Sequence, residues 1–112
     1  MDITFNDLQA YLFHHYGDRA TEQSMFMKLV EEMGEVAEIL NKRAGRKASG
    51  EDDLQRQLAN ELADVIHYTV AIAAINGIDL TDTILSKDKT ASVKYHHDMN
   101  LETFLRTHEG NP

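Results

Sequence analysis

Two groups of acidic residues in this 112-residue sequence are spaced so that they could act together on a helix. The first group lies in "EEMGEVAE" and contains Glu31, Glu32, Glu35 and Glu38. Side chains three or four residues apart lie on one face of a helix, and each like-charged pair opposes helix formation by a few tenths of a kcal/mol. Taken alone, this helix is read equally well as a solvated acidic surface or as half of a cation site.

The second group, Glu61 and Asp64, opens the segment "ELADVIHYTVAIAAI", which is otherwise apolar. At 100° per residue the two acids share a face with Val65, so exposure to solvent does not explain them well. An unpaired buried carboxylate costs several kcal/mol or takes up a proton. Basic partners are scarce, because Arg56 is the nearest in sequence. These acids therefore need another kind of partner.

A divalent cation would satisfy both acidic groups at once. Two helices that each contribute carboxylates at i and i+3 supply the oxygen ligands that Mg²⁺ or Mn²⁺ prefers. The net charge of −8 argues against general nucleic-acid binding, which depends on neutralising phosphates with Lys and Arg. An acidic protein that handles an anionic ligand needs such a cation as intermediary.

The composition predicts one all-α domain and a cytoplasmic protein. The single Pro is the last residue, so the interior lacks the strongest helix breaker. With no Cys there is neither a disulfide framework nor a thiolate metal site. The N-terminus is acidic where a signal peptide would be basic, and no run approaches the roughly 20 apolar residues that span a bilayer. We expect no membrane association.

Hydrophobic periodicity and capping residues predict four helices and a short fifth. They run from about residue 5 to 16, from a cap at Thr21 or Ser24 to about 43, from about 53 to 76, from a cap at Asp79 or Thr81 to about 95, and over residues 100–108, with a polar loop at 44–53. Because residues 62–75 are apolar nearly all round, the third helix is expected at the centre of a bundle or at an oligomer interface. The predicted core face of the second helix contains Phe26, Leu29, Met33, Val36, Ala37 and Leu40.

The combined pattern resembles a known family. "KLVEEMGEVAEIL" followed by "NELADVIHYTVAIAAINGIDL" is similar to the MazG-like nucleotide pyrophosphohydrolases of the all-α NTP pyrophosphatase superfamily. Their signature is E-E-x-x-E, a variable spacer and E-x-x-D, and here the spacer is the 25 residues between Glu35 and Glu61. The resemblance covers about residues 22–95.

The resemblance implies a fold and an activity. The fold would be a single MazG-like domain over residues 1–112, a four-helix bundle-like structure with a short extra C-terminal helix that forms a homodimer or homotetramer. The activity would be Mg²⁺-dependent hydrolysis of a ribo- or deoxyribonucleoside triphosphate to the monophosphate and pyrophosphate, with Mn²⁺ as a substitute metal. Such an enzyme cleans the nucleotide pool, and its chemistry needs no covalent nucleophile.

The resemblance also assigns roles by position. The metal ligands would be Glu32, Glu35, Glu61 and Asp64, and either Glu31 or Glu38 would orient or deprotonate the attacking water. The substrate-binding residues would be Lys28, Lys87 and Lys94. Many family members carry an Asn between the two basic positions of the later helix, and this chain has Ala91 there. A polar side-chain contact from that position is therefore missing.

Three alternatives remain open from the sequence. A related enzyme with the same chemistry acts on phosphoribosyl-ATP, and a non-catalytic nucleotide-binding module could keep the same fold. Asp64 and His67 also form the D-x-x-H spacing of di-iron carboxylate bundles, but those proteins need two such pairs. No second pair stands on another predicted core helix, so a core or interface histidine is the favoured interpretation of His67.

Overall fold

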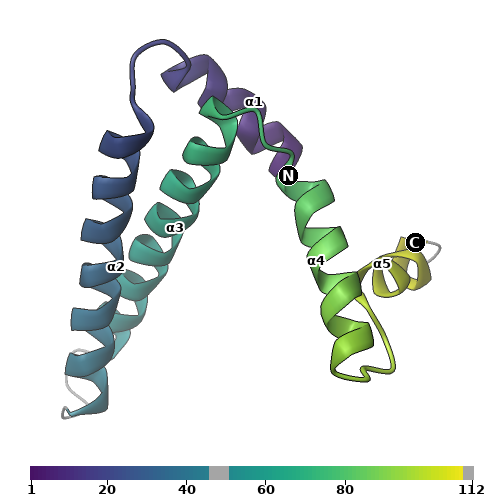
Figure 1. Ribbon diagram of the computed structural model, residues 1–112. Helices are drawn as coiled ribbons and strands as arrows, with labels where there is room; N and C mark the ends of the chain where they lie inside the picture. Colours follow the sequence, from purple (N-terminus) through teal and green to yellow (C-terminus); the bar gives the residue numbers. More distant parts are fainter. Residues whose placement is uncertain (46–50, 110–112) are drawn as a thin grey trace. The chain divides into compact units, whose positions relative to one another are not determined.

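The computed structural model describes residues 1–45 and 51–109, and within these ranges the chain forms helices and no strand. The helices are α1 (Phe5–Tyr16), α2 (Glu22–Ala44), α3 (Glu51–Ile75), α4 (Leu80–Lys94) and α5 (Leu101–Glu109) (Figure 1). The all-α prediction is confirmed. The predicted loop at 44–53 is shorter than expected, because α2 continues to Ala44 and α3 already begins at Glu51, and its residues 46–50 lie outside the described residues.

Side-chain caps fix where the helices begin. Thr4 caps α1 in a reciprocal capping box with Asp7, and Thr21 forms the same box with Ser24 at the start of α2. Asp79 caps α4. Each cap satisfies a backbone N–H that has no partner within its own helix. These contacts select Thr21 over Ser24 and Asp79 over Thr81 among the caps that the sequence left open.

A glycine in the left-handed region ends α3. Gly77 has φ +66°, a conformation that costs other residues more than it costs glycine. The backbone N–H of Ile78 donates to the carbonyl of Ala73 at 2.9 Å, and the N–H of Gly77 donates to Ala74 at 3.2 Å. This pair of bonds is the Schellman motif, so the predicted stop at Asn76-Gly77 is confirmed.

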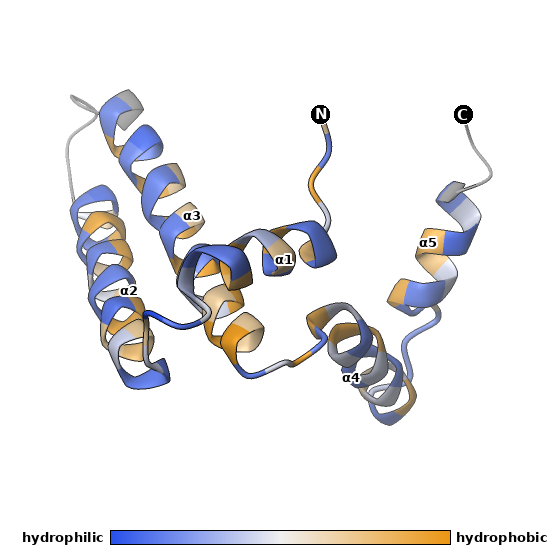
Figure 2. Ribbon diagram, turned by 90° about the horizontal axis from the view of Figure 1, so that it is seen from above, coloured by the Kyte–Doolittle hydropathy of each residue, from blue (hydrophilic) through white to orange (hydrophobic). Residues whose placement is uncertain are grey.

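The chain divides into two compact units, residues 1–78 with α1 to α3 and residues 79–112 with α4 and α5. In the first unit α1 and α2 both pack on α3. Figure 2 shows that hydrophobic residues concentrate in the C-terminal half of α3. Among the described residues, the buried apolar side chains are Leu12, Met25, Ile39, Val70, Ala71, Ala73 and Ala74. The predicted central position of α3 holds within this unit.

The buried stripe of α2 differs from the predicted core face. Met25 and Ile39 are buried and Leu29 and Val36 are half-buried, whereas Phe26, Met33 and Leu40 remain 54%, 54% and 47% exposed. The helix carries two neighbouring apolar stripes, and periodicity does not say which one faces α3. Assigning Phe26, Met33, Ala37 and Leu40 to the core of the single chain was wrong, since all four are exposed. On α1, Leu12 is buried and Phe5 and Phe13 are exposed.

In the second unit, polar contacts hold α5 to α4. The Asp88 carboxylate accepts a hydrogen bond from the backbone N–H of Leu101 at 2.6 Å, and Lys89 lies 3.6 Å from Glu102. Asn100 caps α5 by accepting from the N–H of Thr103. These contacts confirm the predicted short C-terminal helix and its cap.

The sequence predicts no membrane span, but one helix of the structure meets the length and hydropathy criterion for one. Among the described residues, Asp53–Ile75 is long and apolar enough to cross a bilayer by length and composition. The central helix of a soluble protein meets the same criterion, so this is weak support for a membrane span. The segment belongs to α3, which α1 and α2 both cover in part.

Candidate metal centre

Three carboxylate side chains from two helices meet in the first unit. Glu32 of α2 and Glu61 and Asp64 of α3 each offer one oxygen atom, and these three atoms all lie within 4.8 Å of one another. We call Glu32, Glu61 and Asp64 the acidic cluster. Glu32 reaches it because it stands seven residues after Met25 and seven before Ile39, within the stripe of α2 that packs on α3. The structure thus brings the two acidic sequence groups together.

One oxygen of the cluster lacks a partner. Oε2 of Glu61 is buried and forms no hydrogen bond with any of the described residues. A buried carboxylate oxygen without a partner costs free energy, and a charged one costs more than a neutral one. A divalent cation bound by oxygen ligands would remove that cost. The acidic cluster therefore fits a hard cation such as Mg²⁺ in both its chemistry and its unsatisfied atom.

The close approach of three acids raises the pKa of one of them. The pKa of Glu32 is raised to about 7, first because its carboxyl shares a hydrogen bond with Glu61, and further by burial and by the charges of Glu61 and Asp64. Below about pH 7, the Glu32 carboxyl therefore keeps a proton when no cation is bound. A neutral acid at this position lowers the repulsion within the cluster.

The other predicted acidic residues lie on the exposed side of α2. Glu35 is exposed and is not part of the acidic cluster, although it is one helical turn from Glu32. Glu31 forms an exposed ion pair with Lys28 at 3.5 Å, and Glu38 forms one with Lys42 at 3.3 Å. Their assigned roles stay predictions.

The predicted basic residues Lys87 and Lys94 lie in the second unit and line one surface cavity there. The cavity has a volume of about 350 Å³ and is lined by Ser86, Lys87, Thr90, Ala91, Lys94 and Tyr95. The ammonium of Lys94 lies 5.3 Å from the centre of the Tyr95 ring, within range of a cation–π interaction. The two lysines thus share one face of α4 with Ala91, as their spacing indicated.

A hydrogen bond that the sequence did not reveal links α1 to α3. The hydroxyl of Tyr16 and Nε2 of His67 are 2.8 Å apart. The pKa of Tyr16 is raised, mainly by burial and further by Tyr68 and Tyr11, so its phenol stays protonated near neutral pH. This contact gives His67 a structural partner. No sequence signal could have found it, because the two residues are 51 positions apart.

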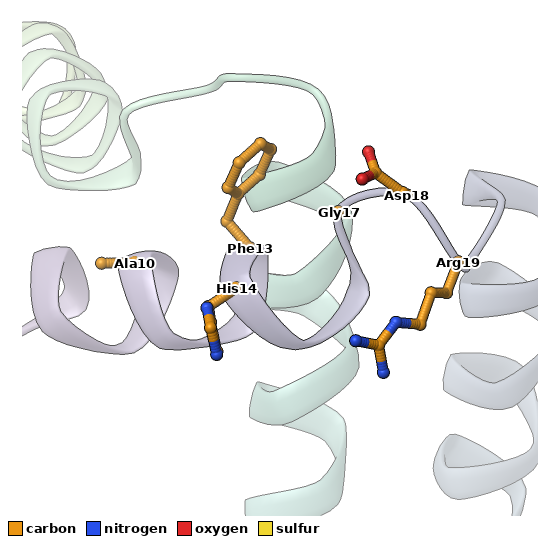
Figure 3. A pocket seen from close by; sticks show the side chains of 6 residues that line it. All are labelled: Ala10, Phe13, His14, Gly17, Asp18 and Arg19. Carbon is orange, nitrogen blue, oxygen red and sulfur yellow. The ribbon is translucent and has the colours of Figure 1, made fainter.

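Another cavity, of about 310 Å³, lies where α1 ends (Figure 3). Its lining residues are Ala10, Phe13, His14, Gly17, Asp18 and Arg19, and none of them belongs to the acidic cluster. Figure 3 shows the Asp18 and Arg19 side chains pointing in different directions rather than toward one point. The cavity therefore lacks the converging polar groups of a ligand site.

Comparison with known proteins agrees with the geometry of the acidic cluster. A model of the MazG nucleotide pyrophosphohydrolase domain matches residues 20–96, a span that includes all three cluster residues. The chain belongs to the MazG family. The resemblance drawn from the two acidic motifs is thereby confirmed.

A solved structure supports the same family. The chain is similar to iMazG from Vibrio DAT 722, with 30% sequence identity and a TM-score of 0.65. The similarity covers 83% of this chain and 98% of the iMazG chain. No curated protein matches the sequence.

The raised pKa of Glu32 predicts a pH dependence of stability in metal-free protein. The folded chain keeps this proton up to about pH 7, whereas the unfolded chain loses it near the ordinary glutamate pKa of 4.5. The proton therefore stabilises the fold at low pH, and that contribution is lost as the pH rises from about 4.5 to 7. In denaturant titrations with EDTA, we expect wild type to lose stability relative to Glu32→Gln over this range. Because Gln does not titrate, parallel curves for the two proteins would contradict the assignment.

Proposed function

We propose that this protein is a Mg²⁺-dependent nucleoside triphosphate pyrophosphohydrolase that converts a ribo- or deoxyribonucleoside triphosphate to the monophosphate and pyrophosphate. The observation that carries the proposal is the acidic cluster with its unpartnered Glu61 oxygen, in a chain of the MazG family. A role in cleaning the nucleotide pool follows from this activity.

In this proposal the acidic cluster holds the cation, and Glu35 supplies a fourth carboxylate from the next turn of α2. When bound, Mg²⁺ polarises the phosphoryl group and lowers the pKa of a coordinated water, and Mn²⁺ can replace it. A triphosphate alone would be repelled by three carboxylates. The protein's part is to fix the ligands on two packed helices, since phosphoryl transfer depends mainly on positioning and charge stabilisation.

The exposed acids beside the cluster are candidates for handling the attacking water. Glu31 and Glu38 flank Glu35 on α2, and either one orients or deprotonates the water in this proposal. Glu31 now pairs with Lys28, so a phosphate that drew Lys28 away would also free the Glu31 carboxylate. The Lys28 and Glu31 side chains are 56% and 64% exposed. Breaking their ion pair would therefore cost little free energy, because an exposed ion pair contributes little stability.

The lysines of α4 are proposed to bind the outer phosphates. Lys87 and Lys94 line the same cavity, and lysine is a common point-charge ligand for phosphate. Ala91 between them offers no hydrogen bond from its side chain. We therefore expect phosphate binding on α4 to depend on charge more than on directional hydrogen bonds, and hence to weaken as salt is added.

The second apolar stripe of α2 supports a homodimer or homotetramer. Its exposed members Phe26, Val30, Met33 and Leu40 are joined on α3 by Leu62 and Ile66, and exposed apolar side chains that cluster in this way mark interaction surfaces. At 100° per residue this stripe lies on one flank of the buried stripe, and Glu31 and Glu35 lie on the other. We propose that a second copy covers the apolar flank and leaves the acidic flank open to substrate.

The decisive experiment is a substrate panel with product analysis. We expect pyrophosphate release from at least one canonical, deoxy or damaged nucleoside triphosphate in Mg²⁺ buffer, abolished by EDTA and restored by Mn²⁺. Phosphoribosyl-ATP belongs in the panel, and turnover of that compound alone would identify the related enzyme instead. If nothing is hydrolysed although nucleotides bind, the protein is a nucleotide-binding module.

Substitutions in the cluster should separate catalysis from folding. We expect Asp64→Asn or Glu35→Gln to lower kcat/KM by at least about 100-fold while circular dichroism stays unchanged, because charge stabilisation of a transition state is worth that much. Asp53→Asn is the matched control, since Asp53 is an exposed acid of α3 outside the cluster, and it should change kcat/KM less than about twofold. Near-normal activity in either Asp64→Asn or Glu35→Gln would refute that residue's assignment as a metal ligand.

A charge placed in the exposed apolar stripe should break the assembly. We expect Met33→Glu to shift the protein toward monomer in light scattering coupled to size-exclusion chromatography, because a carboxylate would be buried in the interface. Gln57→Glu adds the same charge at an exposed position of α3 outside the stripe and should leave the mass unchanged. A wild type that is monomeric at micromolar concentration would refute the oligomer.

A further inference from the structure

The contact between Tyr16 and His67 joins α1 to α3, the helix that carries two of the three cluster residues. Tyr16 is the last residue of α1, and its hydroxyl lies 2.8 Å from Nε2 of His67 on α3. The two rings meet edge to face, with their centres 5.7 Å apart and an interplanar angle of 86°. Both residues are half-buried, so water competes less for this bond than for one on the surface.

Tyr16 also anchors the turn that leads into α2. Its backbone carbonyl accepts hydrogen bonds from the N–H groups of Arg19 at 2.8 Å and Ala20 at 3.2 Å, just before the cap of α2 at Thr21. One residue therefore fixes the end of α1, the approach to α2 and a point on α3. The two helices that carry the acidic cluster are both tied to it.

His67 lies close to the cluster along α3. It follows Asp64 by three residues, which is nearly one helical turn, and its ring also meets that of Tyr68 edge to face at 4.9 Å. α1 and α3 also pack on each other, and Leu12, Val70 and three alanines of α3 are buried in this unit. The hydrogen bond adds an interaction with a preferred direction to this packing, so it favours one rotation of α3.

We propose that Tyr16 is a positioning residue for the acidic cluster, acting through the His67 ring to fix the rotation of α3 and with it the directions of the Glu61 and Asp64 carboxylates. The inference rests on the proposed cation site. Tyr16 itself touches neither substrate nor metal in this account. Its loss should therefore weaken cation binding without removing any ligand.

The test is a cation titration without nucleotide. We expect Tyr16→Phe to weaken Mn²⁺ binding, measured by calorimetry or by the EPR signal of free Mn²⁺, about 3- to 10-fold. This is less than the 10- to 100-fold typical of a direct partner of a metal ligand, because Tyr16 acts one step further away. Tyr11→Phe is the matched control, since Tyr11 is an exposed tyrosine of the same helix, and it should leave Mn²⁺ affinity unchanged.

Substitutions at His67 provide the rescue. Glutamine places a hydrogen-bonding atom near the position of Nε2, so His67→Gln should bind Mn²⁺ almost as tightly as wild type, whereas His67→Leu should match the loss in Tyr16→Phe. The double variant Tyr16→Phe/His67→Leu should lose no more than either single variant, because both remove the same bond. Additive losses would overturn the proposal.

The outcomes also separate this inference from the proposed function. If Tyr16→Phe lowers the melting temperature but binds Mn²⁺ like wild type, Tyr16 only stabilises packing and the inference is wrong. If the variant binds Mn²⁺ more weakly although wild type releases no pyrophosphate from any substrate, the inference stands and the proposed reaction fails. If wild type binds no Mn²⁺, the cation site and the inference fail together.

Discussion

The close approach of three acidic side chains, with one oxygen of each within 4.8 Å of the others, is the constraint on which the first unit depends. Two antiparallel helices packed along an apolar seam would ordinarily exclude such groups from their contact. Here Glu32 occupies a position in that seam, and Glu61 faces it with a buried oxygen that has no partner among the described residues. The packing of Met25 and Ile39 on either side offsets this cost. The free energy of this apolar packing therefore offsets the unfavourable electrostatic energy of the acidic cluster.

The position of α3 explains how one helix serves both packing and chemistry. Its C-terminal half contains buried alanines, and its middle carries Glu61 and Asp64. Both α1 and α2 pack on this helix, while Asp64 remains exposed and Glu61 half-buried. A mutation that shifts α3 would disturb core packing and the cluster together, so stability and cation binding are expected to vary together in this protein.

Much of the fold could be predicted from the sequence, because its determinants are local. Capping residues such as Thr21 and Asp79 and the stop at Gly77 act within a few residues, and the structure places the helix ends close to where these signals indicated. The choice between two apolar stripes on α2 could not be predicted, since either satisfies the helical period. Phe26 and Met33 were assigned to the core for this reason, and they are exposed in the single chain.

The candidate site was predictable to a similar degree. The spacing within each acidic group indicated which side chains share a face. The family pattern predicted that both groups belong to one metal site. That pattern could not show that Glu32, rather than Glu35, meets Glu61 and Asp64 most closely, because this depends on how α2 is rotated against α3. The bond between Tyr16 and His67 depends on three-dimensional contact alone, and it had no precursor in the sequence.

The seam position of Glu32 has a consequence for the charge of the site. Because the pKa of Glu32 is raised to about 7, this acid holds a proton below that pH when no cation is bound. In the proposed site a divalent cation would displace that proton, since a metal ligand must be deprotonated. Loading would then exchange one proton for one cation, and the charge of the site would rise by one unit rather than two. An incoming polyphosphate would therefore meet a smaller positive charge than the cation alone carries, so its binding would depend on direct coordination to the cation.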